Sequence, residues 1–170
     1  MASLDPEHLF EQADRLIVPL ASEPEPRQTD LRRAVSSAYY GVFHFTVASA
    51  ADMFLGTTNR HSEQYNATYR TVTHTWLRAL CDHVRGLLKP KSLPHVPGID
   101  FFGPLVKFAH NVSELQEARH SSDYDPSFDI KPDEANVWIS TAREAVSLFR
   151  SATDRQQVVF MTLLLFNLRK

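Results

Sequence analysis

Apolar side chains recur every three or four residues along most of the chain, which is the spacing of amphipathic α-helices. Over residues 5–20, for example, Leu9, Ala13, Leu16 and Ile17 follow this period, and the acidic residues lie mostly on the other side of the helix. No stretch alternates strictly between apolar and polar positions, as a half-buried strand does. The pattern therefore predicts an all-α protein.

Six helices are predicted, and polar or proline-rich segments separate them. They cover about residues 5–20, 29–54, 64–88, 104–124, 132–149 and 154–167. Because most of the connections are short, the expected architecture is an up-down four-helix bundle core with one or two extra helices. A length of 170 residues fits one domain of this kind, spanning residues 1–170.

The second predicted helix has two apolar seams rather than one. The first seam includes Val35, Ala38, Val42 and Phe45, and the second includes Tyr39, Phe43, Val47 and Ala50. Two seams predict a central helix that packs over a wide arc, and Thr29 or Asp30 is expected to cap its start. The last predicted helix is apolar on nearly all sides, which predicts burial in its own fold or cover by another chain.

Charge and composition exclude several classes of protein. With 18 basic and 20 acidic side chains, the chain cannot bind nucleic acid through bulk positive charge. Cys81 is the only cysteine, which excludes an internal disulfide and suits a reducing compartment. The first residues lack the apolar core of a signal peptide, and the longest apolar run, 158–166, is too short to span a bilayer. A cytoplasmic protein without a membrane segment is expected.

No Cys/His cluster, HExxH motif or glycine-rich phosphate loop occurs, so neither metal nor cofactor is expected.

Two stretches carry more specific information. They are LRRAVSSAYYGVFHF, from Leu31 to Phe45, and ELQEARHSSDYDP, from Glu114 to Pro126. Together they resemble the HEPN superfamily, in particular its small stand-alone prokaryotic members. The resemblance implies a four-helix core with a short extra helix, usually in a homodimer. Many members of that superfamily are metal-independent ribonucleases. Others act with a small nucleotidyltransferase in toxin–antitoxin pairs, or only bind nucleotides.

The ribonuclease signature of this superfamily is an arginine, a polar residue, three further residues and a histidine. Arg119 and His120 match the first two positions, whereas Tyr124 stands where the histidine is expected. Cleavage by 2′-hydroxyl attack needs a base and an acid that work near neutral pH, and tyrosine, with an ordinary pKa of about 10, is a poor base there. An arginine still suits phosphate binding. The resemblance thus implies Arg119, His120 and Tyr124 as catalytic residues only if the protein cleaves RNA.

One face of the second predicted helix is polar and is expected to meet Arg119 across the bundle. This face holds Arg33, Ser37, Tyr40 and His44, at spacings i, i+4, i+7 and i+11. The candidate nucleotide or RNA site therefore comprises Arg33, Tyr40, His44, Arg119 and Asp123. The resemblance also implies an arginine where Ser37 stands, so one phosphate contact is missing here. Two other interpretations stay open. Arg119, Asp123 and Tyr124 can form a buried network that connects the two helices, and the polar face can be solvated or face a second copy of the chain.

Three functions follow from these observations. The first is a HEPN-like module that binds nucleotide, RNA or a cognate nucleotidyltransferase in a toxin–antitoxin or defence context. The second is a non-enzymatic interaction or dimerisation module, which the apolar last helix suggests. The third is a metal-independent ribonuclease in which His120 or His44 replaces the missing histidine.

Overall fold

The computed structural model describes residues 5–87 and 101–166, and these residues form helices and their connections with no strand. The α-helices are α1 (Pro6–Leu16), α2 (Gln28–Leu55), α3 (Glu63–Thr71), α4 (His74–Val84), α5 (Pro104–Tyr124), α6 (Pro132–Ser151) and α7 (Asp154–Leu165). A single 3₁₀ turn, η1 (Thr57–Asn59), follows α2. The prediction of an all-α bundle is confirmed.

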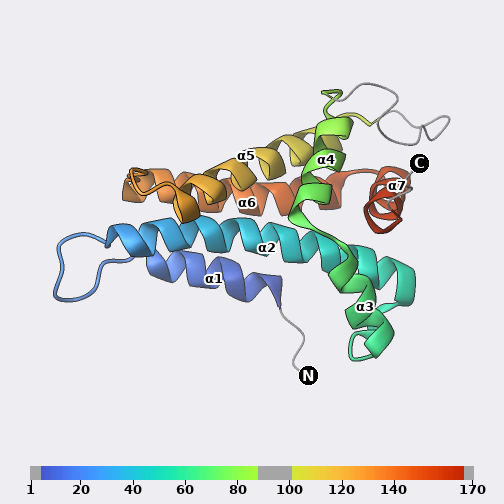
Figure 1. The fold of residues 1–170 in the computed structure, drawn as a ribbon, viewed down its shortest axis with the longest axis horizontal. Coiled ribbons are helices and arrows are strands. Elements are labelled where there is room, and N and C mark those ends of the chain that lie inside the picture. The colour runs from blue at the N-terminus through green and yellow to red at the C-terminus, as the bar shows by residue number, and fades with distance from the viewer. Residues whose placement is uncertain (1–4, 88–100, 167–170) are drawn as a thin grey trace.

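Helix α2 is the central element, as its two apolar seams predict. It packs against α1, α3, α5, α6 and α7. Figure 1 shows α1, α2, α5 and α6 side by side along the long axis of the molecule, with α3, α4 and α7 gathered at the end where α2 finishes. At Gly41 a Cβ atom would lie 2.5 Å from the Phe10 ring, so only glycine lets α1 approach α2 this closely.

The main core lies between these helices. Its largest fully buried side chains include Tyr39, Leu77, Leu80, Leu105, Phe108, Phe149 and Phe160. Helix α7 contributes Phe160, Met161, Leu163 and Leu164 to this core and packs against α2 and α4. The apolar last helix is therefore largely buried in its own fold. Among the described helices, none is both long and apolar enough to cross a membrane.

The predicted helix over 64–88 is wrong in one respect, because it is two helices. Val72 has an extended backbone, and the Thr73 hydroxyl accepts a hydrogen bond from the Trp76 amide at 3.1 Å, which caps the start of α4. The apolar period runs through this break without interruption, so it gives no sign of it. Helix α4 ends at Val84 rather than near residue 88, and α7 ends at Leu165 rather than near residue 167.

Two other predicted helix ends are also corrected. Helix α1 ends at Leu16 rather than near residue 20, because Pro19 disfavours helical backbone in the residue before it. Helix α2 begins at Gln28, and Arg27 rather than Thr29 or Asp30 occupies the N-cap, without a side-chain hydrogen bond. The Gln28 side chain instead bonds to both backbone groups of Ile130, and this tertiary contact supports an earlier start.

Candidate functional site

The polar face of α2 meets the last turns of α5, and Arg119 lies at the meeting point. Its Nη2 atom donates a hydrogen bond to the Tyr40 hydroxyl at 2.7 Å. Its Nε atom lies 2.7 Å from Asp123 Oδ2, in an ion pair whose N–H is not directed at the carboxylate. Asp123 also accepts a hydrogen bond from Ser36 Oγ at 2.6 Å. We call Ser36, Tyr40, Arg119 and Asp123 the Arg119 cluster. It connects α5 to α2. The predicted buried network is therefore present for Arg119 and Asp123, but not for Tyr124, which is exposed.

Tyr124 and His120 lie outside the buried part of this cluster. The Arg119 guanidinium carbon is 5.3 Å from the centre of the Tyr124 ring and equally far from that of Tyr40, so the cation interacts with both aromatic rings. Tyr124 is 64% exposed, and its ring centre is 5.0 Å from that of the exposed His120. These two residues are available to a ligand, while the side chains of Arg119 and Asp123 are each only 17% exposed.

His44 contacts the rings beside it rather than Arg119. Its Nδ1 atom lies 2.6 Å from the Tyr69 hydroxyl of α3, and its ring stacks on both Tyr69 and Tyr40. Burial, and then the nearby His74, lower the pKa of His44. Burial raises the pKa of Tyr69 to about 12. The pair is therefore a protonated tyrosine and a neutral histidine near pH 7.

His74, at the start of α4, is a second half-buried histidine beside α2. Its Nδ1 atom lies 2.9 Å from the Tyr39 hydroxyl. Burial, and then the Arg119 charge, lower the pKa of His74. It is not among the predicted site residues, because neither its spacing nor its neighbours in the sequence indicate this contact.

Arg33 is a predicted site residue that remains accessible. It is exposed and makes no hydrogen bond or ion pair with any described residue. It lines a hollow of about 500 Å³ between the start of α2 and the end of α5, which we call the α2–α5 pocket. The lining residues are Gln28, Thr29, Arg32, Arg33, Ser122, Asp123 and Tyr124. Arg33 also borders a smaller hollow between α1 and α2, which Tyr40 lines too.

Two further residues of the α2–α5 pocket were not predicted. Arg32 donates hydrogen bonds to the backbone oxygens of Ser122 and Asp125 at 2.7 Å, and to that of Phe128 at 3.4 Å. All three of these hydrogen bonds go to backbone carbonyls, and the nearby Asp125 carboxylate also interacts with the Arg32 charge. The Ser122 hydroxyl is buried and has no hydrogen-bond partner. Arg32 could have been suspected from its place next to Arg33, but its backbone partners leave no trace in the sequence.

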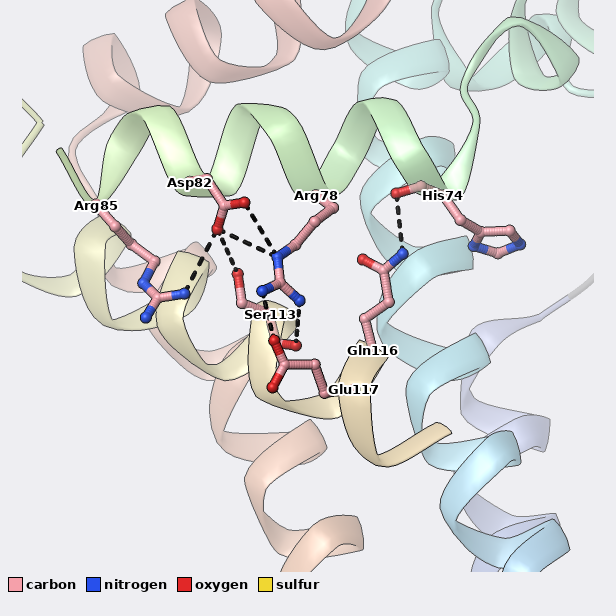
Figure 2. Close-up of polar contacts among 7 residues, drawn as sticks. All are labelled: His74, Arg78, Asp82, Arg85, Ser113, Gln116 and Glu117. Carbon is pink, nitrogen blue, oxygen red and sulfur yellow. Dashed lines mark hydrogen bonds and ion pairs between the residues drawn. The ribbon is translucent and has the colours of Figure 1, made fainter. Parts of the chain in front are cut away.

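A second arginine cluster connects α4 to α5 (Figure 2). Arg78 donates to both carboxylate oxygens of Asp82 at 3.2 Å, to the Ser113 backbone oxygen at 3.0 Å and to Glu117 Oε1 at 2.5 Å. Arg85 also lies 3.6 Å from Asp82. We call Arg78, Asp82, Arg85, Ser113 and Glu117 the Arg78 cluster. None of its residues was predicted as a site residue.

The described residues contain no group of three or more side chains arranged to hold a metal ion. Comparisons of the chain with protein-family models, with curated proteins and with solved structures find no match in any of the three. The HEPN resemblance thus rests on the residues of α2 and α5 alone.

Proposed function

We propose that this protein binds a phosphate-bearing ligand, RNA or a nucleotide, in the α2–α5 pocket. The observation that carries the proposal is Arg33, an exposed arginine without a hydrogen bond or ion pair to any described residue, beside Arg32, which is hydrogen-bonded to backbone carbonyls. No side chain caps the first turn of α2, so its amides add positive potential at the same place, which the Asp30 carboxylate in that turn partly offsets. A phosphate group fits this combination of a guanidinium fork and helix amides.

The remaining residues take different parts in this proposal. The exposed ring of Tyr124 offers a face on which a base can stack. Arg119 already has Asp123 and Tyr40 as partners, so we assign it the role of positioning Tyr124 and Asp123 rather than of contacting phosphate. The local charge of Arg32 and Arg33 accounts for nucleic-acid binding by a chain whose net charge is close to zero.

The resemblance of α2 and α5 to HEPN proteins supports the same class of ligand. Proteins of that superfamily act in toxin–antitoxin and defence systems. Their partner is a second copy of the same chain or a small nucleotidyltransferase. We include such a setting in the proposal. It adds no residue to the α2–α5 pocket, so the binding experiment below does not depend on it.

The test is fluorescence anisotropy of a short 5′-phosphorylated, fluorescein-labelled single-stranded RNA at low salt. We expect Arg33→Ala to weaken binding about tenfold or more, because it removes the unpaired phosphate contact. The control is Arg155→Ala, which removes an exposed arginine of α7, at the opposite end of the bundle from the start of α2 (Figure 1). Equal affinities for the two variants, or no binding by the wild-type protein, would overturn the proposal.

The same RNA, incubated without metal, separates binding from cleavage. Cleavage by the wild-type protein that is lost in Arg119→Ala would establish a ribonuclease with a displaced acid–base residue. Cleavage by Tyr124→His alone would show that the phosphate site is competent but lacks a residue that transfers protons near pH 7. Binding without cleavage in all three proteins is the expected result.

A further inference from the structure

A second hollow, of about 520 Å³, lies between α5 and α6 and shares no lining residue with the α2–α5 pocket. Its apolar part is made by Ala118, Phe128, Ile130, Val137 and Trp138. Ala118 and Ile130 are buried in a small core cluster against which Phe128 and Trp138 pack. Val137, by contrast, is 61% exposed. The hollow therefore has a fixed apolar floor that stays open to a ligand, and we call it the α5–α6 groove.

The rim of the α5–α6 groove is acidic throughout. Glu114, Glu117, Asp129 and Glu134 line it, and no lysine, arginine or histidine does. Glu117 is paired with Arg78, and Glu134 accepts a hydrogen bond from the Lys131 amide. Glu114 and Asp129 make no hydrogen bond or ion pair with any described residue. Two unneutralised carboxylates thus face the groove, one from α5 and one from the connection to α6. The whole chain has a net charge of only −2, so this group of acidic side chains is a local feature and does not follow from the overall composition.

We propose that the α5–α6 groove binds a peptide segment of a partner protein in which an arginine or lysine stands beside an apolar residue. The floor removes the apolar side chain from water, and the two unpaired carboxylates receive the cation. Trp138 adds a partly exposed indole face for the cation, and its Nε1–H, which has no partner among the described residues, can donate to a peptide carbonyl. RNA is not the occupant, because the carboxylates repel its phosphates. The two hollows are thus suited to ligands of opposite charge.

The probe is a short fluorescein-labelled peptide of alternating arginine and leucine, titrated with the full-length protein and followed by anisotropy. We expect saturable binding that the double variant Glu114→Gln/Asp129→Asn weakens about tenfold, since two charge contacts of modest strength are lost together. The matched control is Glu11→Gln/Glu25→Gln. It makes the same change of net charge at two exposed carboxylates that have no partner among the described residues and do not line the groove.

The apolar half of the proposal is tested separately. Val137→Lys places a cation at an exposed position of the groove, where it should not disturb packing, and we expect it to weaken binding of the same peptide. Replacement of the leucines of the peptide by serine should do so as well. Equal affinity of the two double variants, or of the leucine and serine peptides, would overturn the proposal, because binding would then be non-specific charge attraction. Circular dichroism establishes that each variant is folded.

Discussion

The Arg119 cluster and the Arg78 cluster both use an arginine to connect α5 to a neighbouring helix, but only one of them is complete. Each of the three nitrogens of the Arg78 guanidinium donates to an oxygen, and two carboxylates share its charge. Arg119 has one carboxylate, Asp123, and its Nε–H is buried without a hydrogen bond. Figure 2 shows the hydrogen bonds and ion pairs that Arg78 makes with residues of α4 and α5.

The incomplete contacts lie along a single stripe of α5. Gln116 Oε1, Arg119 Nε and Ser122 Oγ are buried atoms without hydrogen-bond partners, and their residues are spaced at i, i+3 and i+6. Most buried polar atoms in proteins are paired, so these three atoms set this part of α5 apart from the Arg78 cluster. The two clusters thus differ in how fully the arginine is hydrogen-bonded within the protein, and this difference leads to different expected effects when each cluster is broken.

The strongest test of this comparison is Asp123→Ala. This change leaves the mostly buried Arg119 charge without a carboxylate and removes the acceptor of Ser36. We expect the free energy of unfolding to fall by about 3 kcal/mol, because an unpaired charge in such a site is costly. Urea denaturation measures the loss. The control Asp123→Asn, which keeps the shape and an acceptor for Ser36, should lose less.

Arg78→Ala should have a smaller effect, although Arg78 makes more contacts. Glu117 is 62% exposed and can return to water, and Asp82 keeps Arg85 as a neighbour. We expect a loss of about 1.5 kcal/mol and unchanged RNA binding. A larger loss of stability than in Asp123→Ala, or weaker RNA binding, would break the comparison.

A third, smaller effect is expected from pH, because His44 and His74 are held neutral on the α2 side. The pKa of each is lowered in the folded protein, so the unfolded chain binds protons first as the pH falls. Stability should therefore be constant above the ordinary histidine pKa of about 6.5 and should decrease as the pH falls below it. Thermal denaturation at several pH values measures this. The double variant His44→Gln/His74→Gln should have a flatter profile, and an unchanged profile would contradict the assignment.

Sequence periodicity predicted correctly those parts of the molecule in which the backbone is helical wherever the apolar side chains follow the helical period. It located α2 and α5, and the i, i+4 spacing of Arg119 and Asp123 predicted their ion pair. It did not predict the break at Val72 and Thr73, because a helix cap interrupts the backbone there without interrupting the apolar period. The spacing of Arg33 and Tyr40 likewise predicted that they share one face of the helix. It could not show that Tyr40 is hydrogen-bonded to Arg119, whereas Arg33 has no partner among the described residues.

The remaining site features depend on contacts that no local pattern encodes. Arg32 is held by backbone oxygens about 90 residues away in the chain, and any residue type can supply such an acceptor. The α5–α6 groove combines α5, α6 and their connection, so its acidic rim is visible only when these three segments are packed. Residues that act through backbone groups or through a shared hollow are thus the ones that sequence reasoning missed.

The smallest expected effect comes from Ser122→Ala, and it tests the incomplete stripe most directly. Ser122 is 4% exposed, and its hydroxyl has no partner, so removing the oxygen costs no hydrogen bond and relieves a desolvated polar group. We expect the free energy of unfolding to change by less than about 0.5 kcal/mol. Ser36→Ala, which loses the bond to Asp123, should cost about 1 kcal/mol. If Ser122→Ala is the more destabilising of the two, the hydroxyl has a partner within the protein and the stripe is not incomplete. If the stability of Ser122→Ala is unchanged while its RNA binding weakens, the Ser122 hydroxyl contacts the ligand. The two clusters of α5 would then differ in ligand binding as well as in stability.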